Sequence, residues 1–141
     1  MVVTASTLWL IDTSALRPHV MKFAEVLIPR IAAGRVSICL LTELEVGYST
    51  RSLSDFERIS RDVLAPLNRL ITPVATEARA REVQRALIAC GQHRAIAIPD
   101  LIVAAVAEIE GLTVLHYDGD FDLIADITGQ PTEWIVPPGS A

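Results

Sequence analysis

Four carboxylates stand at positions from which they could hold a metal ion together: Asp12, Glu43, Asp100 and Asp118. Asp12 and Asp118 each follow a short apolar run, and Glu43 lies just beyond a third such run. Asp100 lies in the first turn of an otherwise apolar helical segment, where a charge is out of place without a partner. An acid cluster without His or Cys suits a hard cation such as Mg²⁺ or Mn²⁺. Without a cation, the converging carboxylates would raise one another's pKa.

Each of these residues, taken alone, also has a simpler interpretation. An Asp after a strand is often a helix N-cap, Asp100 is an ordinary helix start, and Asp118 begins a common Asp-Gly turn. Glu43 competes with Glu45, since one of the two can be structural while the other is exposed. His116 ends an apolar run near the acids and could assist them, but we expect a surface side chain. The metal site is therefore favoured only if the fold brings the acids together.

The elements that would do so follow from the hydrophobic pattern. Short apolar runs alternate with helical periodicity, which predicts a single α/β domain over residues 1–136, with a mainly parallel sheet flanked by helices, and a flexible tail at 137–141. In such sheets ligands bind beyond the carboxyl ends of the strands, where the strand order switches. The predicted strands cover residues 8–11, 36–41, 70–74, 113–116 and 133–136, and the predicted helices cover 20–33, 42–48, 54–70, 76–90, 99–110 and 121–127.

The composition narrows the class of protein. The chain has 141 residues, a net charge of −5, and hydrophobic residues make up 51% of it, which describes one globular domain. Its longest apolar run, residues 101–107, is far below the roughly 20 residues that span a bilayer. The N-terminus lacks a basic segment and Asp12 interrupts its apolar run, so we expect no signal peptide and a cytoplasmic location. Any attraction to phosphate must come from local arginines or a bound cation.

Several other kinds of site are excluded by their motifs. Asp118, Asp120 and Asp122 occupy positions 1, 3 and 5 of a calcium-binding EF-hand loop, but Leu123 and Gly129 stand where Gly and Glu are required. The chain has no GxGxxG, GxxxxGK[ST] or GxSxG motif, which argues against a dinucleotide fold, a P-loop NTPase and a serine hydrolase. Its two cysteines lack zinc-site spacing.

Four segments carry a resemblance to a known family: LWLIDTSAL at 8–16, TELEVGYS at 42–49, IPDLIVAAVA at 98–107 and VLHYDGDFDLIA at 114–125. In order and spacing they are similar to the motifs of the PIN-domain family, most closely to its VapC-type toxins of bacterial toxin–antitoxin pairs. The resemblance spans nearly the whole chain. It implies a parallel five-stranded sheet flanked by helices and a Mg²⁺- or Mn²⁺-dependent ribonuclease.

The resemblance also assigns roles to single residues. It favours Glu43 over Glu45, because the family's acid lies four residues before a Gly, here Gly47. Asp120 would support the metal through a water molecule, and the division of labour between Asp118 and Asp120 stays open. Thr13 or Ser14 would hydrogen-bond a metal-binding carboxylate, as groups around a metal site usually do. The implied metal-binding and catalytic residues are Asp12, Glu43, Asp100 and Asp118.

The implied function is the toxin of a type II toxin–antitoxin pair. Such a chain would be an endoribonuclease acting on RNA phosphodiester bonds, a homodimer, and neutralised by a VapB-type antitoxin that places a basic side chain in the acid pocket. The alternative is a PIN-fold module that binds RNA or protein without catalysis. A Mg²⁺-dependent phosphatase is a third hypothesis, and Lys22, the chain's single lysine, would then have to serve the phosphate.

Overall fold

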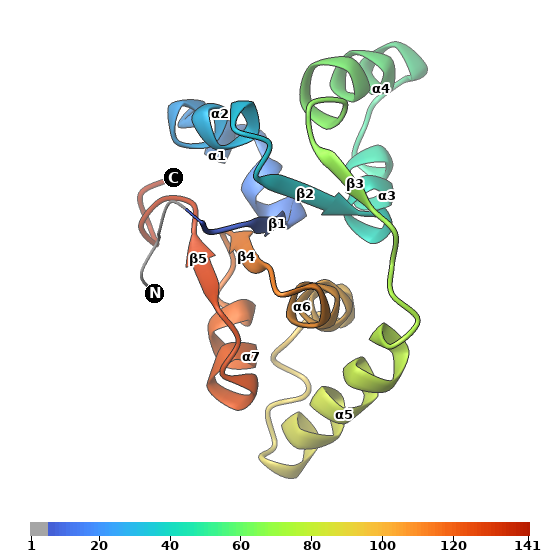
Figure 1. Cartoon of the computed structure of the whole chain (residues 1–141), viewed down its shortest axis with the longest axis vertical. Coiled ribbons are helices and arrows are strands. Elements are labelled where there is room, and N and C mark those ends of the chain that lie inside the picture. Colours follow the sequence, from blue (N-terminus) through green and yellow to red (C-terminus); the bar gives the residue numbers. More distant parts are fainter. Residues whose placement is uncertain (1–5) are drawn as a thin grey trace.

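A five-stranded parallel sheet runs through the centre of the protein in the order β3-β2-β1-β4-β5 (Figure 1). The computed structural model describes residues 6–141, so the first five residues of the predicted domain lie outside it. The α/β fold class and the parallel sheet predicted from the sequence are confirmed. The strands are β1 (Trp9–Ile11), β2 (Val36–Cys39), β3 (Asn68–Leu70), β4 (Thr113–His116) and β5 (Thr132–Trp134).

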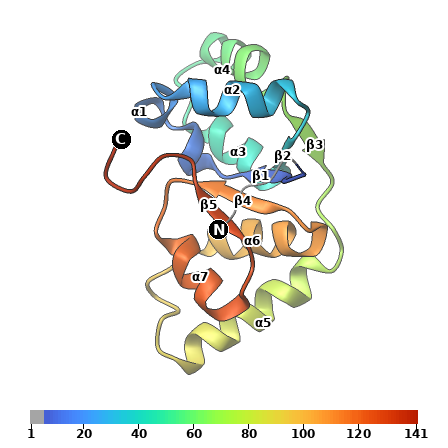
Figure 2. The same ribbon diagram turned by 60° about the vertical axis from the view of Figure 1, so that its left-hand side comes forward.

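Helices cover both faces of this sheet (Figure 2). The 3-10 helix η1 with α1, α2, α3 and α4 lies on one face, and α5, α6 and α7 lie on the other. They are η1 (Thr13–Leu16), α1 (Pro18–Met21), α2 (Ala24–Ala32), α3 (Leu40–Tyr48), α4 (Leu53–Ile59) with a π-helical continuation η2 (Ser60–Leu64), α5 (Thr76–Ala89), α6 (Ile98–Glu110) and α7 (Asp120–Thr128).

The two hydrophobic cores follow from the alternation of side chains along the strands. Leu10 points into the core shared with α5, α6 and α7, while Trp9 and Ile11 point into the core shared with η1, α1 and α2. All three residues of β1 are buried, as expected for the central strand of a sheet covered on both faces. The end of this strand is consequently held on all sides, which fixes the position of whatever follows it.

The strand order creates a switch point between β1 and β4. From β1 the chain builds outward through β2 to β3, and later returns to place β4 on the other side of β1. Ile11 pairs with Leu115 in register, so the two central strands end at nearly the same level. Loops leaving neighbouring strands in opposite directions open a crevice at this edge. Asp12 follows β1 directly and Asp118 follows β4 after one residue, so both start at this crevice.

Several boundaries differ from the predicted ones for local reasons. The predicted helix 20–33 is interrupted at Lys22 and Phe23 instead of at Pro29, which is accommodated inside α2. Strand β3 covers Asn68–Leu70 instead of the predicted 70–74, so it ends before Pro73 and occupies the end of the predicted helix 54–70; it lies at the edge of the sheet. The helix-capping residue of α4 is Ser52, whose hydroxyl accepts from the Asp55 amide, so the helix begins at Leu53, one residue before the predicted start at 54.

The C-terminal residues 137–141, predicted to be a flexible tail, contact the body of the protein. The Tyr117 hydroxyl accepts hydrogen bonds from the Gly139 amide at 2.9 Å and the Ala141 amide at 3.1 Å. Within residues 6–141, no helix combines the length and the apolar character needed to cross a membrane.

Candidate metal centre

Three carboxylates meet beyond the sheet's switch point. Asp100, Asp118 and Asp120 each offer one oxygen, and these oxygens all lie within 4.8 Å of one another. Asp100 comes from the first turn of α6, Asp118 from the turn after β4, and Asp120 from the first residue of α7. The sequence therefore placed Asp100 and Asp118 correctly beside each other, and Asp120 joins them as a full member of the cluster.

Backbone hydrogen bonds hold two of the three acids in place. The Asp120 amide donates to Asp118 Oδ1 at 3.0 Å, which closes the Asp-Gly-Asp turn. The Ala97 amide, just before α6, donates to Asp120 Oδ2 at 2.9 Å. This second bond ties the loop before α6 to the start of α7. The turn predicted for Asp118 and the acid cluster are thus the same feature, because the turn itself brings Asp118 and Asp120 together.

Asp12 completes the cluster from the end of β1. Its side chain is 3% exposed, and its Oδ2 accepts from the Ser14 amide at 2.9 Å, which caps η1. Asp12 can serve both as the N-cap and as a member of the site, because only one of its two oxygens caps the helix. Charge interactions link Asp12 with both Asp100 and Asp118, so it belongs to the same electrostatic group.

The electrostatics of this group favour protons over bare charge. Burial raises the pKa of Asp100 to about 9, and a hydrogen bond with Asp120 and the charges of Asp12, Asp118 and Asp120 add to that rise. Burial also raises the pKa of Asp12, although hydrogen bonds from Ser14 and Thr13 partly offset it. In the absence of a cation, these acids disfavour full ionisation.

The donor set fits a hard divalent cation. Within residues 6–141, no ion pair joins Asp12, Asp100, Asp118 or Asp120 to a basic side chain. In the same part of the chain, Asp100 Oδ2 is buried without a hydrogen-bond partner, which is costly for a carboxylate oxygen. Every donor at the centre is a carboxylate oxygen, the ligand type that Mg²⁺ and Mn²⁺ prefer. A cation here would supply the missing partner.

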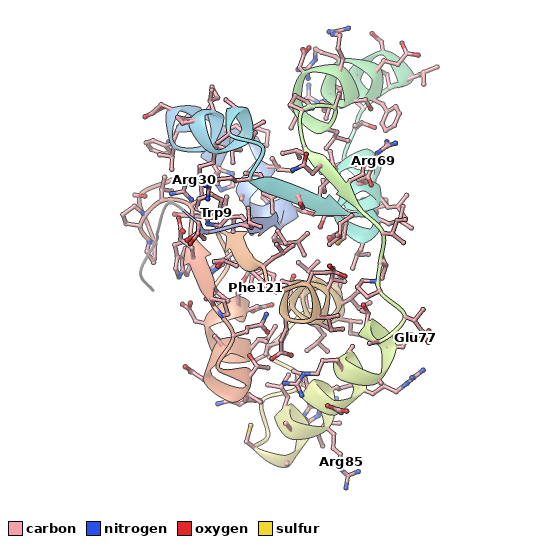
Figure 3. All side chains as sticks on the ribbon, in the orientation of Figure 1. Trp9, Arg30, Arg69, Glu77, Arg85 and Phe121 are labelled. Carbon is pink, nitrogen blue, oxygen red and sulfur yellow. The ribbon has the colours of Figure 1, made fainter. Side chains whose placement is uncertain are left out.

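Glu43 and Glu45 point to different sides of α3, as residues two apart on a helix must. Glu45 Oε1 accepts from Thr13 Oγ1 at 3.1 Å, and burial raises the pKa of Glu45 with a further contribution from the charge of Asp12. Glu43 instead forms an ion pair with Arg69 on β3, with 3.0 Å between Oε1 and Nε (Figure 3). In this structure Glu45 faces Asp12, and Glu43 faces the edge strand.

His116 does not lie on the surface, as we expected, but is fully buried. Its ring packs between Phe121 and Trp134, with 5.0 Å between ring centroids in each pair. Burial lowers the pKa of His116 to about 4, so the imidazole is neutral and its Nδ1 can accept from the Asp118 amide at 3.1 Å. The surface expectation failed because His116 is the last residue of β4 and still points into the core.

Two further contacts around the centre could not be predicted from the sequence. The Tyr117 amide donates to Ser14 Oγ at 2.8 Å and so joins the ends of β1 and β4. Ser14 was expected to support a carboxylate, and it does so through its amide while its hydroxyl serves this junction. The Ala97 contact uses a backbone amide, which every residue except proline possesses. Only the position of Ala97 directly before the start of α6 at Ile98 could have suggested it.

A second feature is an apolar groove between α3, α4 and η2 with a volume of about 1040 Å³; Asp12, Asp100, Asp118 and Asp120 do not line it. We call it the α3–α4 groove. Exposed apolar side chains lie along it, among them Leu44, which is 61% exposed, and Leu53, which is 70% exposed. Glu43 and Arg69 also line this groove. It therefore combines an apolar floor with an acidic side chain that belongs to the predicted metal-binding set.

Comparisons with known proteins agree with this geometry. Residues 9–127 match the family model of the PIN domain. Ribonuclease VapC21 of Mycobacterium tuberculosis is 45% identical over 140 residues, covering 96% of this chain and 99% of the relative. Ribonuclease VapC2 of the same species is 46% identical over 129 residues, covering 89% of this chain and 90% of the relative.

Solved structures share the fold at lower identity. The VapBC2 complex of Rickettsia felis, bound to a DNA fragment from its promoter, contains a chain with a TM-score of 0.74 and 17% identity, covering 91% of this chain and 99% of that one. VapBC-5 of M. tuberculosis gives a TM-score of 0.64 at 19% identity, covering 90% and 96%. These likenesses establish the fold alone. Together with the family match and the close relatives, they lead to one conclusion: the chain belongs to the PIN-domain family, in its VapC branch.

Proposed function

We propose that this chain is a divalent-cation-dependent endoribonuclease and the toxin of a type II toxin–antitoxin pair. The observation that carries the proposal is the convergence of Asp12, Asp100, Asp118 and Asp120 at the switch point of the sheet. The relatives at 45% and 46% identity are themselves named ribonucleases, which supports RNA as the substrate. The all-oxygen donor set supports Mg²⁺ or Mn²⁺ as the cofactor.

The residues around the centre have distinct tasks in this proposal. A bound cation would lower the pKa of a water molecule and stabilise negative charge on the phosphate. Asp100 and Asp118 would hold the cation, and Asp12 would face it with the oxygen that does not cap η1. His116 keeps Asp118 in place by accepting its amide hydrogen, which requires the neutral imidazole that burial provides. Ala97 restrains Asp120 by donating its backbone amide hydrogen to the Asp120 carboxylate.

The experiment compares two aspartates from the same segment. Asp118→Asn should reduce cleavage of a structured RNA by roughly 100-fold or more, because one metal-binding oxygen is replaced by an amide. Asp122→Asn is the matched control: Asp122 is exposed and accepts from Trp134 Nε1 outside the cluster, so cleavage should stay close to wild type. Chelation of divalent cations should abolish cleavage by the wild type and by Asp122→Asn. RNA binding that persists without cleavage or metal would instead support the non-catalytic binding module.

Glu43 is the further acid that we propose for the centre, and this requires that it leave Arg69 when a cation binds. Glu43→Gln and Glu45→Gln differ by two positions on one helix and remove the same charge. Titration calorimetry with Mn²⁺ should show about tenfold weaker binding for Glu43→Gln and little change for Glu45→Gln. The reverse result would assign the role to Glu45, which lies nearer to Asp12 in this structure.

We propose the α3–α4 groove as the docking surface of a VapB-type antitoxin. Its apolar floor suits an amphipathic helix, and Glu43 at its side would attract a basic side chain from that helix. The solved VapBC assemblies contain toxin and antitoxin together, which supports such a partner. Leu44→Glu should abolish antitoxin binding while cleavage of RNA remains. Ile28→Glu on α2, where the side chain is equally exposed, is the control that should leave binding intact.

The homodimer remains a prediction of the family resemblance, and the cytoplasmic location remains a prediction from the N-terminal sequence. A homodimer would bury exposed apolar side chains such as Ile71 and Val74, which are 90% and 93% exposed. Sedimentation of the purified chain should give twice the mass of one chain. Val74→Asp should shift the equilibrium toward the monomer if this surface is involved. A cytoplasmic location is expected, and fractionation of cells would test it.

A further inference from the structure

A short turn between α5 and α6 presents two basic side chains to solvent. The Ala95 amide donates to the Gln92 carbonyl at 3.1 Å, so His93 and Arg94 are the two corner residues of a β-turn. Both side chains are exposed. After the turn, Ile96 is buried in the core shared with α5 and α6. The turn is therefore fixed at its base while its corner residues face outward.

The chain contacts the acid cluster directly after this turn. Ala97, three residues after Arg94, donates its amide to Asp120 at 2.9 Å. Asp100 follows in the first turn of α6. In residues 6–141, Arg94 forms no ion pair with an acidic side chain. Arg94 therefore has a guanidinium group without an ion pair, three residues before the Ala97 amide that contacts Asp120.

A second arginine, Arg17, follows the helix η1 on the other face of the sheet. It lies five residues after Asp12 and is exposed. Its positive charge lowers the pKa of Glu45, which places it near the Asp12 side of the centre. The η1 helix belongs to the core on one face of the sheet and Ile96 to the core on the other (Figure 2). The acid centre therefore lies at an edge between the two layers that carry Arg17 and Arg94.

Most other arginines are already engaged. An arginine that holds a carboxylate has fewer donors left for a phosphate, so paired residues are weaker candidates for RNA contacts. Arg17 and Arg94 differ from the paired set both in this respect and in their link to the centre. The arginines in ion pairs are Arg30, Arg58, Arg61, Arg69, Arg79 and Arg81.

We propose that Arg17 and Arg94 bind RNA phosphates on the two flanks of the metal centre and so position the scissile bond over the carboxylates. The inference rests on the proposed ribonuclease function. A chain of net charge −5 with an acid cluster at its site repels a polyanion unless local cations offset that charge. A guanidinium group suits this task because its planar fork donates two parallel hydrogen bonds to a phosphate.

The test measures RNA binding apart from cleavage. In an Asp100→Asn background, which prevents cleavage, fluorescence anisotropy gives the Kd of a labelled single-stranded RNA from about 50 to about 200 mM KCl. Arg17→Gln and Arg94→Gln should each raise Kd about tenfold. Each should also lower the slope of log Kd against log salt concentration by about 0.7, the value for one single-strand phosphate contact. Arg94→Lys should restore part of the affinity, since it keeps the charge without the fork.

Arg58→Gln provides the matched control. It removes the same charge from α4, where Arg58 is bound to Asp55, and should leave Kd and slope unchanged. Circular dichroism checks that all variants are folded. Unchanged binding by Arg17→Gln and Arg94→Gln, or equal weakening by Arg58→Gln, would overturn the inference while leaving the proposed function intact. A protein that neither binds nor cleaves RNA would overturn both.

Discussion

Replacing Asp100 with Asn should stabilise the metal-free protein at neutral pH while removing its ability to bind a cation. Asp100 is 7% exposed and one of its oxygens lacks a partner within residues 6–141, while Asp12, Asp118 and Asp120 surround it with like charge. Asparagine has nearly the same shape as the protonated acid but no charge to bury. The substitution therefore removes a penalty instead of a favourable contact.

The magnitude follows from the pKa. The pKa of Asp100 rises from an ordinary 3.8 to about 9 on folding, because burial and neighbouring carboxylates disfavour its charge. A group with a raised pKa lowers the free energy of unfolding as pH rises, beginning near its unfolded pKa and ending near its folded one. At about 1.4 kcal/mol per pH unit, the interval from 3.8 to neutral pH gives an upper limit of about 4 kcal/mol. Because the protein relaxes around a buried charge, the true penalty is smaller, and we expect Asp100→Asn to raise the free energy of unfolding by about 2 kcal/mol.

Urea unfolding of both proteins in the presence of a chelator measures this difference. At neutral pH Asp100→Asn should unfold at higher urea concentration than the wild type. The gap should close as the pH falls below 3.8, where Asp100 is protonated in both the folded and the unfolded state. Added Mg²⁺ or Mn²⁺ should stabilise the wild type by mass action and leave Asp100→Asn nearly unchanged. An Asp100→Asn protein that is less stable than wild type at neutral pH without metal would refute the reasoning.

Two further predictions concern the framework around the centre. Phe121 is fully buried beneath the acid turn and packs against His116, so Phe121→Ala should lower the free energy of unfolding by about 3–5 kcal/mol, measured in urea. A loss below about 1 kcal/mol would show that Phe121 does not anchor the turn. Ser52→Ala should cost about 1 kcal/mol because it removes the cap of α4, whereas Ser54→Ala should cost almost nothing. Equal losses would contradict the assignment of the cap.

The proximity of Asp12, Asp100 and Asp118 could be predicted from the sequence because their positions depend on the sheet. Once β1 and β4 are recognised as neighbouring buried strands, Asp12 and Asp118 must arrive at the same edge. Asp100 was recognisable as a charge at the start of an apolar helix, and burial there is what gives it a raised pKa. Phe121, which directly follows the Asp-Gly-Asp turn, is fully buried and holds the turn against the core.

The features that the sequence left open or missed depend on side-chain direction and on backbone groups. Glu43 and Glu45 are two residues apart, so a rotation of α3 decides which one faces Asp12, and apolar periodicity does not fix that rotation closely enough. His116 was expected at the surface because polar residues usually end strands there, yet aromatic neighbours bury it. The amide of Ala97 acts through its position alone. Such contacts follow from tertiary packing and have no local pattern.

The most direct test of the central claim is a crystal of the protein grown with Mn²⁺ and measured for anomalous scattering. The account predicts a peak coordinated by carboxylate oxygens of Asp100 and Asp118, with Asp12 and Asp120 in direct contact or one water molecule away. The ion pair between Glu43 and Arg69 should be broken in that crystal. Mn²⁺ bound elsewhere on the chain, with no peak among these carboxylates at saturating concentration, would contradict the account.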